Sequence, residues 1–300
     1  MKKILISVFS IAVVGLVAFG ATQAFFSDTE TSKGNVLQAG ALDLKIDNTC
    51  YYNGQACVQG FWQGNAGIGN TGNVGIGNTD QANACSCTWT SKDLAQGDVF
   101  FNLHDLKPGD WEEDTISINV DNPSWLCADI KVTRDADNSC TEPEIKDETT
   151  AGKVCVPPNS DGELAENLNF VFWTDDGDNV YECDPQRDAC EKVLTEGTAD
   201  KVLGNVRWAL ADSKTGNGPI GPKTYYIGKF FCFGRIGQAP ELPGNGGPIG
   251  GRGSGFTCDG KSVDNQSQTD SLEGDISFYA EQSRNNPKFL CNPPASPTPT

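Results

Sequence analysis

The chain of 300 residues has little of what metal centres and nucleic-acid surfaces need. It contains one His and one Met, and its 22 Lys and Arg residues are outnumbered by 40 Asp and Glu residues, so its formal net charge is −18. A protein that binds DNA or RNA needs cations to neutralise phosphates, so this charge predicts no nucleic-acid partner. The same charge disfavours anionic membrane surfaces and favours divalent cations and basic partners.

Several motifs of enzyme chemistry are missing as well. The chain has no HExxH, no GxSxG and no CxxC sequence, and its only imidazole, His104, stands where a surface residue at a strand end is expected. Gly67–Gly72 matches GxGxxG, but dinucleotide binding also needs a strand before the motif and a helix after it. We therefore predict a protein that is not an enzyme and that requires no cofactor.

Cysteine is abundant and even in number. The twelve cysteines are Cys50, Cys57, Cys85, Cys87, Cys127, Cys140, Cys155, Cys183, Cys190, Cys232, Cys258 and Cys291. With no CxxC pair, their number favours disulfides and an oxidising compartment. The pairs Cys50/Cys57, Cys127/Cys140 and Cys183/Cys190 are close enough in sequence to clip local loops, but the sequence leaves the connectivity open.

The N-terminus has the organisation of an export signal. Lys2 and Lys3 precede an apolar run from Ile4 to Gly20, and Thr22–Ala24 places small residues at a cleavage site. We predict that residues 1–24 are a signal peptide and that the mature protein is secreted or displayed at the cell surface. A retained anchor is the alternative, because the run is at the lower limit for spanning a membrane. After cleavage no membrane contact is expected.

Beyond the signal, apolar residues recur with period two, which indicates half-buried β-strands joined by Gly, Pro and Asn turns. Strands are expected at 42–46, 99–103, 116–120, 128–132, 168–174, 206–211, 225–236 and 275–281, and one helical turn at 163–168. The predicted fold class is all-β, a jelly-roll-like antiparallel β-sandwich with long Gly-rich loop insertions and disulfides.

Composition also divides the chain. Residues 25–36 form an N-terminal extension or donor strand, and residues 37–292 a single β-sandwich domain. Gly-rich and Pro-rich stretches place insertions at 48–98 and 237–260, and residues 293–300 are a Pro/Thr-rich tail.

Acidic residues gather behind one expected strand. Asp175, Asp176, Asp178 and Glu182 offer hard oxygen ligands on a Gly-containing turn, which suits Ca²⁺ although the spacing is not that of an EF-hand. The alternative is a set of solvated turn residues. A second acidic cluster consists of Asp135, Asp137, Asn138, Glu142 and Glu144.

Three segments carry a family resemblance. Ala24–Ser32, Gly40–Ile46 and the Asn102–Asp110 turn, which continues into 116–122, resemble the TasA/camelysin family, whose precursors carry a SipW-type signal peptide. The cysteine-bearing remainder is similar to a poorly characterised, cysteine-rich branch of that family. The resemblance implies a secreted jelly roll that, in matrix and pilus-like members, polymerises by inserting an N-terminal strand into the neighbouring subunit.

On that analogy Phe25, Phe26 and Val36 would anchor the donated strand, and subunits would self-associate through it. The same segment could instead pair within its own subunit, and both pairings fit the sequence equally. The leading functional expectation is a biofilm-matrix or pilus-like filament subunit. A calcium-stabilised surface adhesin or binding module is the alternative. A metal-dependent secreted peptidase rests only on a label that some family members carry.

Overall fold

A computed structural model describes residues 27–31, 43–64, 84–156, 162–204, 206–216, 218–244 and 252–293. Outside these ranges lie the expected signal peptide 1–24, the anchors Phe25, Phe26 and Val36, the Gly67–Gly72 motif and the tail after residue 293. None of the helices in the described part is long and apolar enough to cross a membrane.

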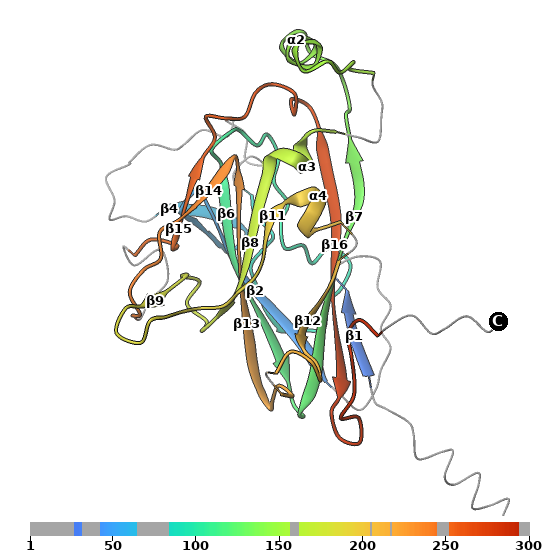
Figure 1. Cartoon of the computed structure of the whole chain (residues 1–300), viewed down its shortest axis with the longest axis vertical. Helices are drawn as coiled ribbons and strands as arrows, with labels where there is room; N and C mark the ends of the chain where they lie inside the picture. The colour runs from blue at the N-terminus through green and yellow to red at the C-terminus, as the bar shows by residue number, and fades with distance from the viewer. Residues whose placement is uncertain are drawn as a thin grey trace, which may run out of the picture.

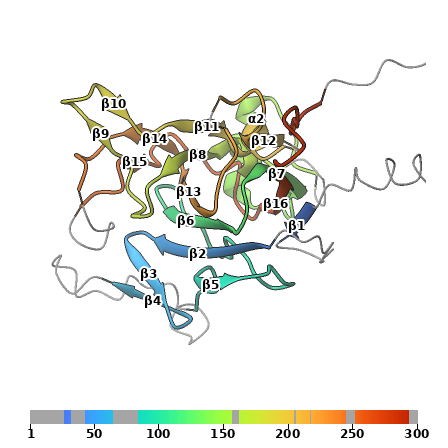
Figure 2. The same cartoon turned by 90° about the horizontal axis from the view of Figure 1, so that it is seen from below.

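Two antiparallel sheets make up the sandwich (Figure 1, Figure 2). The four-stranded sheet has the order β1 (Ser27–Thr31), β16 (Ser271–Gln282), β7 (Ser124–Ala136) and β12 (Val206–Ala211). The eight-stranded sheet has the order β11 (Val193–Thr198), β8 (Leu168–Asp175), β13 (Lys223–Phe233), β6 (Trp111–Val120), β2 (Leu44–Tyr52), β3 (Gln55–Val58) and β4 (Phe61–Gly64), with β5 (Trp89–Lys92) beside β2. The predicted all-β sandwich is therefore confirmed.

Two small hairpins are attached to the larger sheet. One pairs β9 (Cys183–Asp184) with β10 (Ala189–Cys190), and the other pairs β14 (Arg235–Gln238) with β15 (Phe256–Asp259). The second hairpin covers part of the outer face, where an apolar cluster joins Trp173, Phe230 and Phe256. Because of this cover, the larger sheet is buried on both faces in its central strands.

The period-two pattern works because the core lies between the sheets. Ile116 and Ile118 of β6 point into it from one side, and Ile276 and Phe278 of β16 point into it from the other. Burial alternates along β2 in the same way. The expected strands 168–174 and 206–211 coincide closely with β8 and β12.

Two of the expected strands differ from the strands in the structure. Residues 99–103 form no strand; instead Phe100 is 2% exposed and packs edge-on against Trp89 and Phe278. The expected strand 225–236 breaks into β13 and β14 at Gly234, whose φ of 139° brings its backbone against Asp259. In both places tertiary packing overrides local alternation.

The structure also contains a helix that alternation does not reveal. α2 (Glu142–Ala151) begins at Thr141, whose side chain accepts a hydrogen bond from the Glu144 amide while the Glu144 carboxylate accepts one from the Thr141 amide. This is a capping box, and Pro143 follows in the first turn. The shorter α3 (Leu164–Asn167) confirms the helical turn expected at 163–168, and α4 (Ala199–Val202) adds another.

All twelve cysteines are paired. The bonds are Cys50–Cys87, Cys57–Cys85, Cys127–Cys291, Cys140–Cys155, Cys183–Cys190 and Cys232–Cys258. Of the three neighbouring pairs, only Cys183/Cys190 is correct. Cys127/Cys140 is wrong because most of the chain between them is extended strand, which separates them far beyond disulfide reach. Cys50/Cys57 is wrong because the segment around Cys85 and Cys87 crosses this hairpin and bonds to both. Six disulfides fit an oxidising, extracellular environment.

Candidate functional sites

The first candidate site is the outer edge of the four-stranded sheet. β1 occupies this edge and pairs antiparallel with β16, from Ser27 opposite Glu281 to Thr31 opposite Ser277. Figure 1 shows β1 beside β16, at the end of the molecule away from α2. Within one chain, then, part of the expected donor segment completes its own sheet. A strand held at an edge by main-chain hydrogen bonds can in principle be replaced by an equivalent strand from a second chain.

The acidic loop behind β8 divides into two groups. Asp178 Oδ2 lies 2.7 Å from Arg252 Nη1, and Glu182 pairs with the same guanidinium. Asp175 instead accepts the amide N–H groups of Gly177 and Asn179, at 2.9 and 3.1 Å. The four predicted calcium ligands therefore do not converge on one point, because a cation of the chain itself neutralises two of them.

The remaining acids of this loop gather around a residue that the sequence did not indicate. Asp175, Asp176 and Glu191 each offer an oxygen within 4.8 Å of the other two. Burial, reinforced by Asp175, raises the pKa of Glu191 to about 8. Burial also raises the pKa of Asp178 to about 6, against the opposing charge of Arg252. This loop thus carries an excess of negative charge, which a proton or a cation would relieve.

A second acidic cluster lies beneath α2. Asp137 follows β7, Glu144 is in the first turn of α2 and Asp270 precedes β16, and their oxygens lie within 4.8 Å of one another. Asp137 is 3% and Glu144 1% exposed. Among the described residues, neither Asp137 Oδ1 nor Asp270 Oδ1 accepts a hydrogen bond. Three converging carboxylates, two of which carry a buried oxygen without a hydrogen-bond donor, suit Ca²⁺ better than the predicted loop does.

The electrostatics of this cluster agree with that interpretation. Burial, together with the nearby Glu163 and Glu144 carboxylates, raises the pKa of Asp270 to about 7. Burial also raises the pKa values of Asp137 and Glu144. A divalent cation would remove the cause of these shifts by replacing repulsion with coordination.

Only part of this cluster was foreseen. The sequence indicated Asp137 and Glu144, whereas Asp270 is brought in by the pairing of β16 with β7. The other members of the expected set point elsewhere. Asn138 donates hydrogen bonds to the Thr269 carbonyl, just before β16, and to the hydroxyl of Ser271, the first residue of β16. Glu142 is exposed. Asp135 lies within β7.

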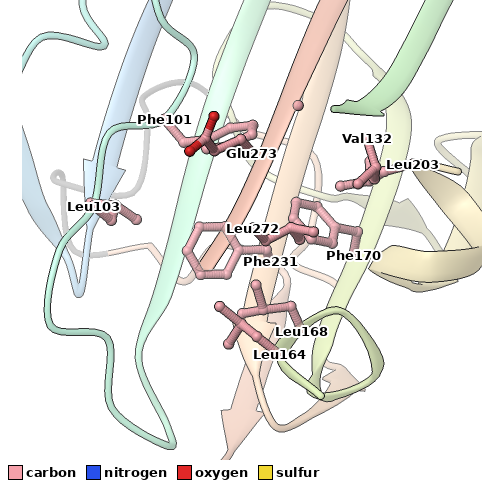
Figure 3. A pocket seen from close by; sticks show the side chains of 11 residues that line it. Phe101, Leu103, Val132, Leu164, Leu168, Phe170, Leu203, Phe231, Leu272 and Glu273 are labelled. Atoms are coloured by element: carbon pink, nitrogen blue, oxygen red, sulfur yellow. The ribbon is translucent and has the colours of Figure 1, made fainter. Parts of the chain in front are cut away.

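His104 and an apolar cavity are weaker candidates for a functional site. His104 is exposed, as expected, and in the described part of the chain it joins no group of potential metal ligands. An apolar cavity of about 50 Å³ lies between the sheets, walled by Phe101, Phe170 and Phe231 among others (Figure 3). Small-molecule sites are typically several times larger, so this cavity is a packing defect and not a ligand site.

A further cluster escaped sequence reasoning altogether. Lys229, Glu112 and Asp114 are completely buried between the sheets. A signal existed, since Lys229 interrupts an otherwise apolar strand and Glu112–Asp114 open another, but neither strand alone shows that the two charges meet.

Comparison with known proteins adds no constraint. Neither a protein-family model nor a curated protein sequence matches this chain.

Proposed function

We propose that this protein is a non-enzymatic structural protein, secreted or displayed at the cell surface, whose subunits join into matrix or pilus-like filaments by strand donation. The observation that carries the proposal is the edge position of β1, which among the described strands pairs only with β16 and belongs to the N-terminal extension. The resemblance of the N-terminal and Asn102–Asp110 segments to the TasA/camelysin family supports it. The six disulfides are consistent with a subunit that works outside the cell.

Strand donation exchanges one β1 segment for an identical segment of another subunit. When β1 leaves its own edge, β16 presents unpaired N–H and C=O groups that the same segment of another subunit can satisfy in the same register. Such an exchange preserves the main-chain hydrogen bonds between β1 and β16. The protein concentration and the connection between β1 and β2 therefore decide whether β1 pairs within its own subunit or with another subunit. Because one subunit both donates and accepts, the exchange propagates into a filament.

The register of β1 on β16 gives a direct test. Thr31 and Ser277 are opposite each other, and opposite residues of antiparallel strands lie within disulfide distance. We expect that mixing Thr31→Cys protein with Ser277→Cys protein under assembly conditions produces a covalent dimer on a non-reducing gel. A chain carrying both substitutions should give a ladder of covalent oligomers, together with filaments in negative stain.

A matched control places the second cysteine at the other end of β16, which β1 does not contact. Ser271 of β16 is opposite Ala136 of β7, away from β1. Mixing Thr31→Cys with Ser271→Cys protein should therefore yield no covalent dimer. If the Thr31→Cys, Ser277→Cys double variant cross-links only within monomers and the mixture stays monomeric, β1 is a permanent part of its own subunit and strand donation is wrong.

The Asp137–Glu144–Asp270 cluster favours a second candidate function, a calcium-stabilised surface adhesin or binding module. This function needs no polymerisation, and it would place the cation between α2 and the ends of β7 and β16.

Calcium titration tests this candidate. A cation at about a hundred times its Kd should stabilise the folded protein by about 2.7 kcal/mol, seen as a raised thermal midpoint. Asp270→Asn should abolish the rise, because the variant keeps an acceptor for the Leu164 amide but loses the charge. Asp176→Asn is the control and should retain it. Loss of the rise in Asp176→Asn alone would move the site to the acidic loop, and no rise in the unmodified protein would reject calcium.

A further inference from the structure

The buried charge cluster lies in the middle of the larger sheet. Lys229 of β13 is directly opposite Asp114 of β6, and Glu112 stands two residues from Asp114 on the same face. All three side chains are 0% exposed. Lys229 Nζ is 2.6 Å from Asp114 Oδ2 and 2.9 Å from Glu112 Oε2. An amine and two carboxyl groups are thus held in contact with water excluded.

The two carboxyl groups contact the amine in different ways. Lys229 donates a hydrogen bond to Glu112 Oε2. Its shorter contact with Asp114 is not aligned as a hydrogen bond, and the buried Asn48 side chain of β2 also interacts with the Asp114 carboxyl group. Glu112 is therefore placed to exchange protons with Nζ, whereas Asp114 presents its carboxyl group to the nitrogen.

Aromatic rings close the site. Nζ lies 5.0 Å from the centre of the Phe101 ring and 6.0 Å from that of Phe231. Both rings also wall the apolar cavity of Figure 3, which has too few polar partners to hold water. Across the sheet, Phe172 of β8 is directly opposite Lys229, and Cys50 of β2 is directly opposite Asp114, so these two residues flank the Lys229–Asp114 pair. Nothing polar beyond the cluster and the Phe100 carbonyl faces the amine among these neighbours.

Charge in this cluster does not balance when all three groups are ionised, because one ammonium faces two carboxylates. Burial raises the pKa of Glu112 to about 8, with Lys229 opposing the shift, so Glu112 holds a proton at neutral pH. Burial alone would lower the pKa of Lys229, but Asp114 and Glu112 outweigh it and raise the pKa. The resting cluster is an ammonium and a carboxylate beside a neutral acid, and a net shift of one proton from Nζ to Asp114, relayed by Glu112, converts the ion pair into an amine and an acid.

We propose that Lys229 and Asp114 condense into an intramolecular isopeptide bond that covalently joins β13 to β6, with Glu112 as the catalytic proton carrier. Nothing in this proposal depends on filament formation.

The step balances without any co-reactant. After the proton transfer, the neutral Nζ attacks Cγ of Asp114 and the C–N bond forms. Glu112 gives its proton to a carboxyl oxygen of Asp114 and takes one from Nζ. One C–O bond then breaks: Glu112 gives a proton to that oxygen, which leaves as water, and takes the proton of the other hydroxyl as the C=O bond re-forms. No atom changes oxidation state.

Three physical effects favour the product. Holding the reactants in contact replaces a bimolecular encounter by a high effective concentration. Exclusion of water opposes hydrolysis of the amide once the released molecule has escaped. Conversion of a buried ion pair into a neutral amide removes the desolvation cost that otherwise burdens the fold.

Mass spectrometry of the unmodified protein is the primary test. After denaturation, reduction and alkylation, we expect the peptides that contain Lys229 and Asp114 to appear as one linked species, lighter than their sum by one water. Trypsin should not cleave after Lys229. Fragment ions should place the bond at Asp114. Separate peptides of full mass would overturn the proposal, and a bond to Glu112 would overturn the assignment of roles.

Variants separate the chemistry from the fold. Asp114→Asn should still form the bond but release ammonia, which gives a product of the same mass as the linked unmodified protein. Glu112→Gln should fold, judged by circular dichroism, with the bond absent or formed much more slowly; a bond formed at the unmodified rate would reject Glu112 as the proton carrier. Lys45 and Asp43, whose charges are 2.5 Å apart on the exposed surface, are an internal control and should remain unlinked.

Discussion

Replacement of both Cys127 and Cys291 by alanine is expected to lower the free energy of unfolding by about 5 kcal/mol, because this bond closes the longest loop of the six. The two cysteines are 164 residues apart in sequence. Three other disulfides nested inside this loop shorten it, but the entropy depends only on the logarithm of its length, so the expected loss hardly changes.

The native contacts around this bond add to the effect. Cys291 lies beyond β16, and its amide donates a hydrogen bond to Asp212 Oδ2 at 3.2 Å. The Phe289 carbonyl accepts a hydrogen bond from the Ser213 amide. These contacts hold the segment after β16 against β7 and β12, and the disulfide keeps that segment close to them when the chain unfolds. Urea denaturation of the oxidised variant, followed by far-UV circular dichroism, measures the loss.

Cys183–Cys190 provides the matched control. The two residues are 7 apart and directly opposite in the β9–β10 hairpin, so the same entropic argument gives a loss of only about 2 kcal/mol for the alanine pair. Equal losses for the two double variants would contradict the loop-length account. They would indicate that local packing around each bond governs its contribution.

The strands show how far alternation alone can reach. The apolar residues located β8 and β12 almost to the residue, although β8 is buried on both faces and does not alternate. Alternation failed at 99–103, where apolar residues cover the side of the sandwich without joining a ladder. It also gave no sign of α2, which begins at a local capping box and contributes little to the core. A local capping box and period-two burial are separate signals, and the second carries no information about a helix that packs little against the core.

The candidate sites required information that a linear sequence does not hold. Asp137 and Glu144 are neighbours along the chain, but Asp270 joins them only because β16 pairs with β7 across the sheet. Lys229 and Asp114 likewise meet through the pairing of β13 with β6. In the acidic loop, composition suggested calcium, yet Arg252 neutralises two of the acids from another loop. In each case a contact between segments far apart in the sequence, which alternation does not specify, decides the outcome.

Stability is expected to fall as pH rises from about 5 to about 8. Burial raises the pKa of Glu112 to about 8 and that of Asp270 to about 7. In this window the unfolded chain has released protons that these folded carboxyl groups still bind, so the free energy of unfolding decreases with pH. Below the window both states are protonated and the effect disappears. The change should be on the order of a few kcal/mol, measured as thermal midpoints across the range.

Asp270→Asn should flatten the part of this profile near pH 7, because the variant has no proton to release there. Glu142→Gln removes an exposed acid from the first turn of α2 and should leave the profile unchanged. A profile that rises with pH in the unmodified protein would contradict the raised pKa values.

Calcium binding at the cluster beneath α2 should depend on the same titration of Asp270. If the cation binds Asp270, it must displace that residue's proton, so its apparent affinity should increase as pH rises through about 7 and level off above it.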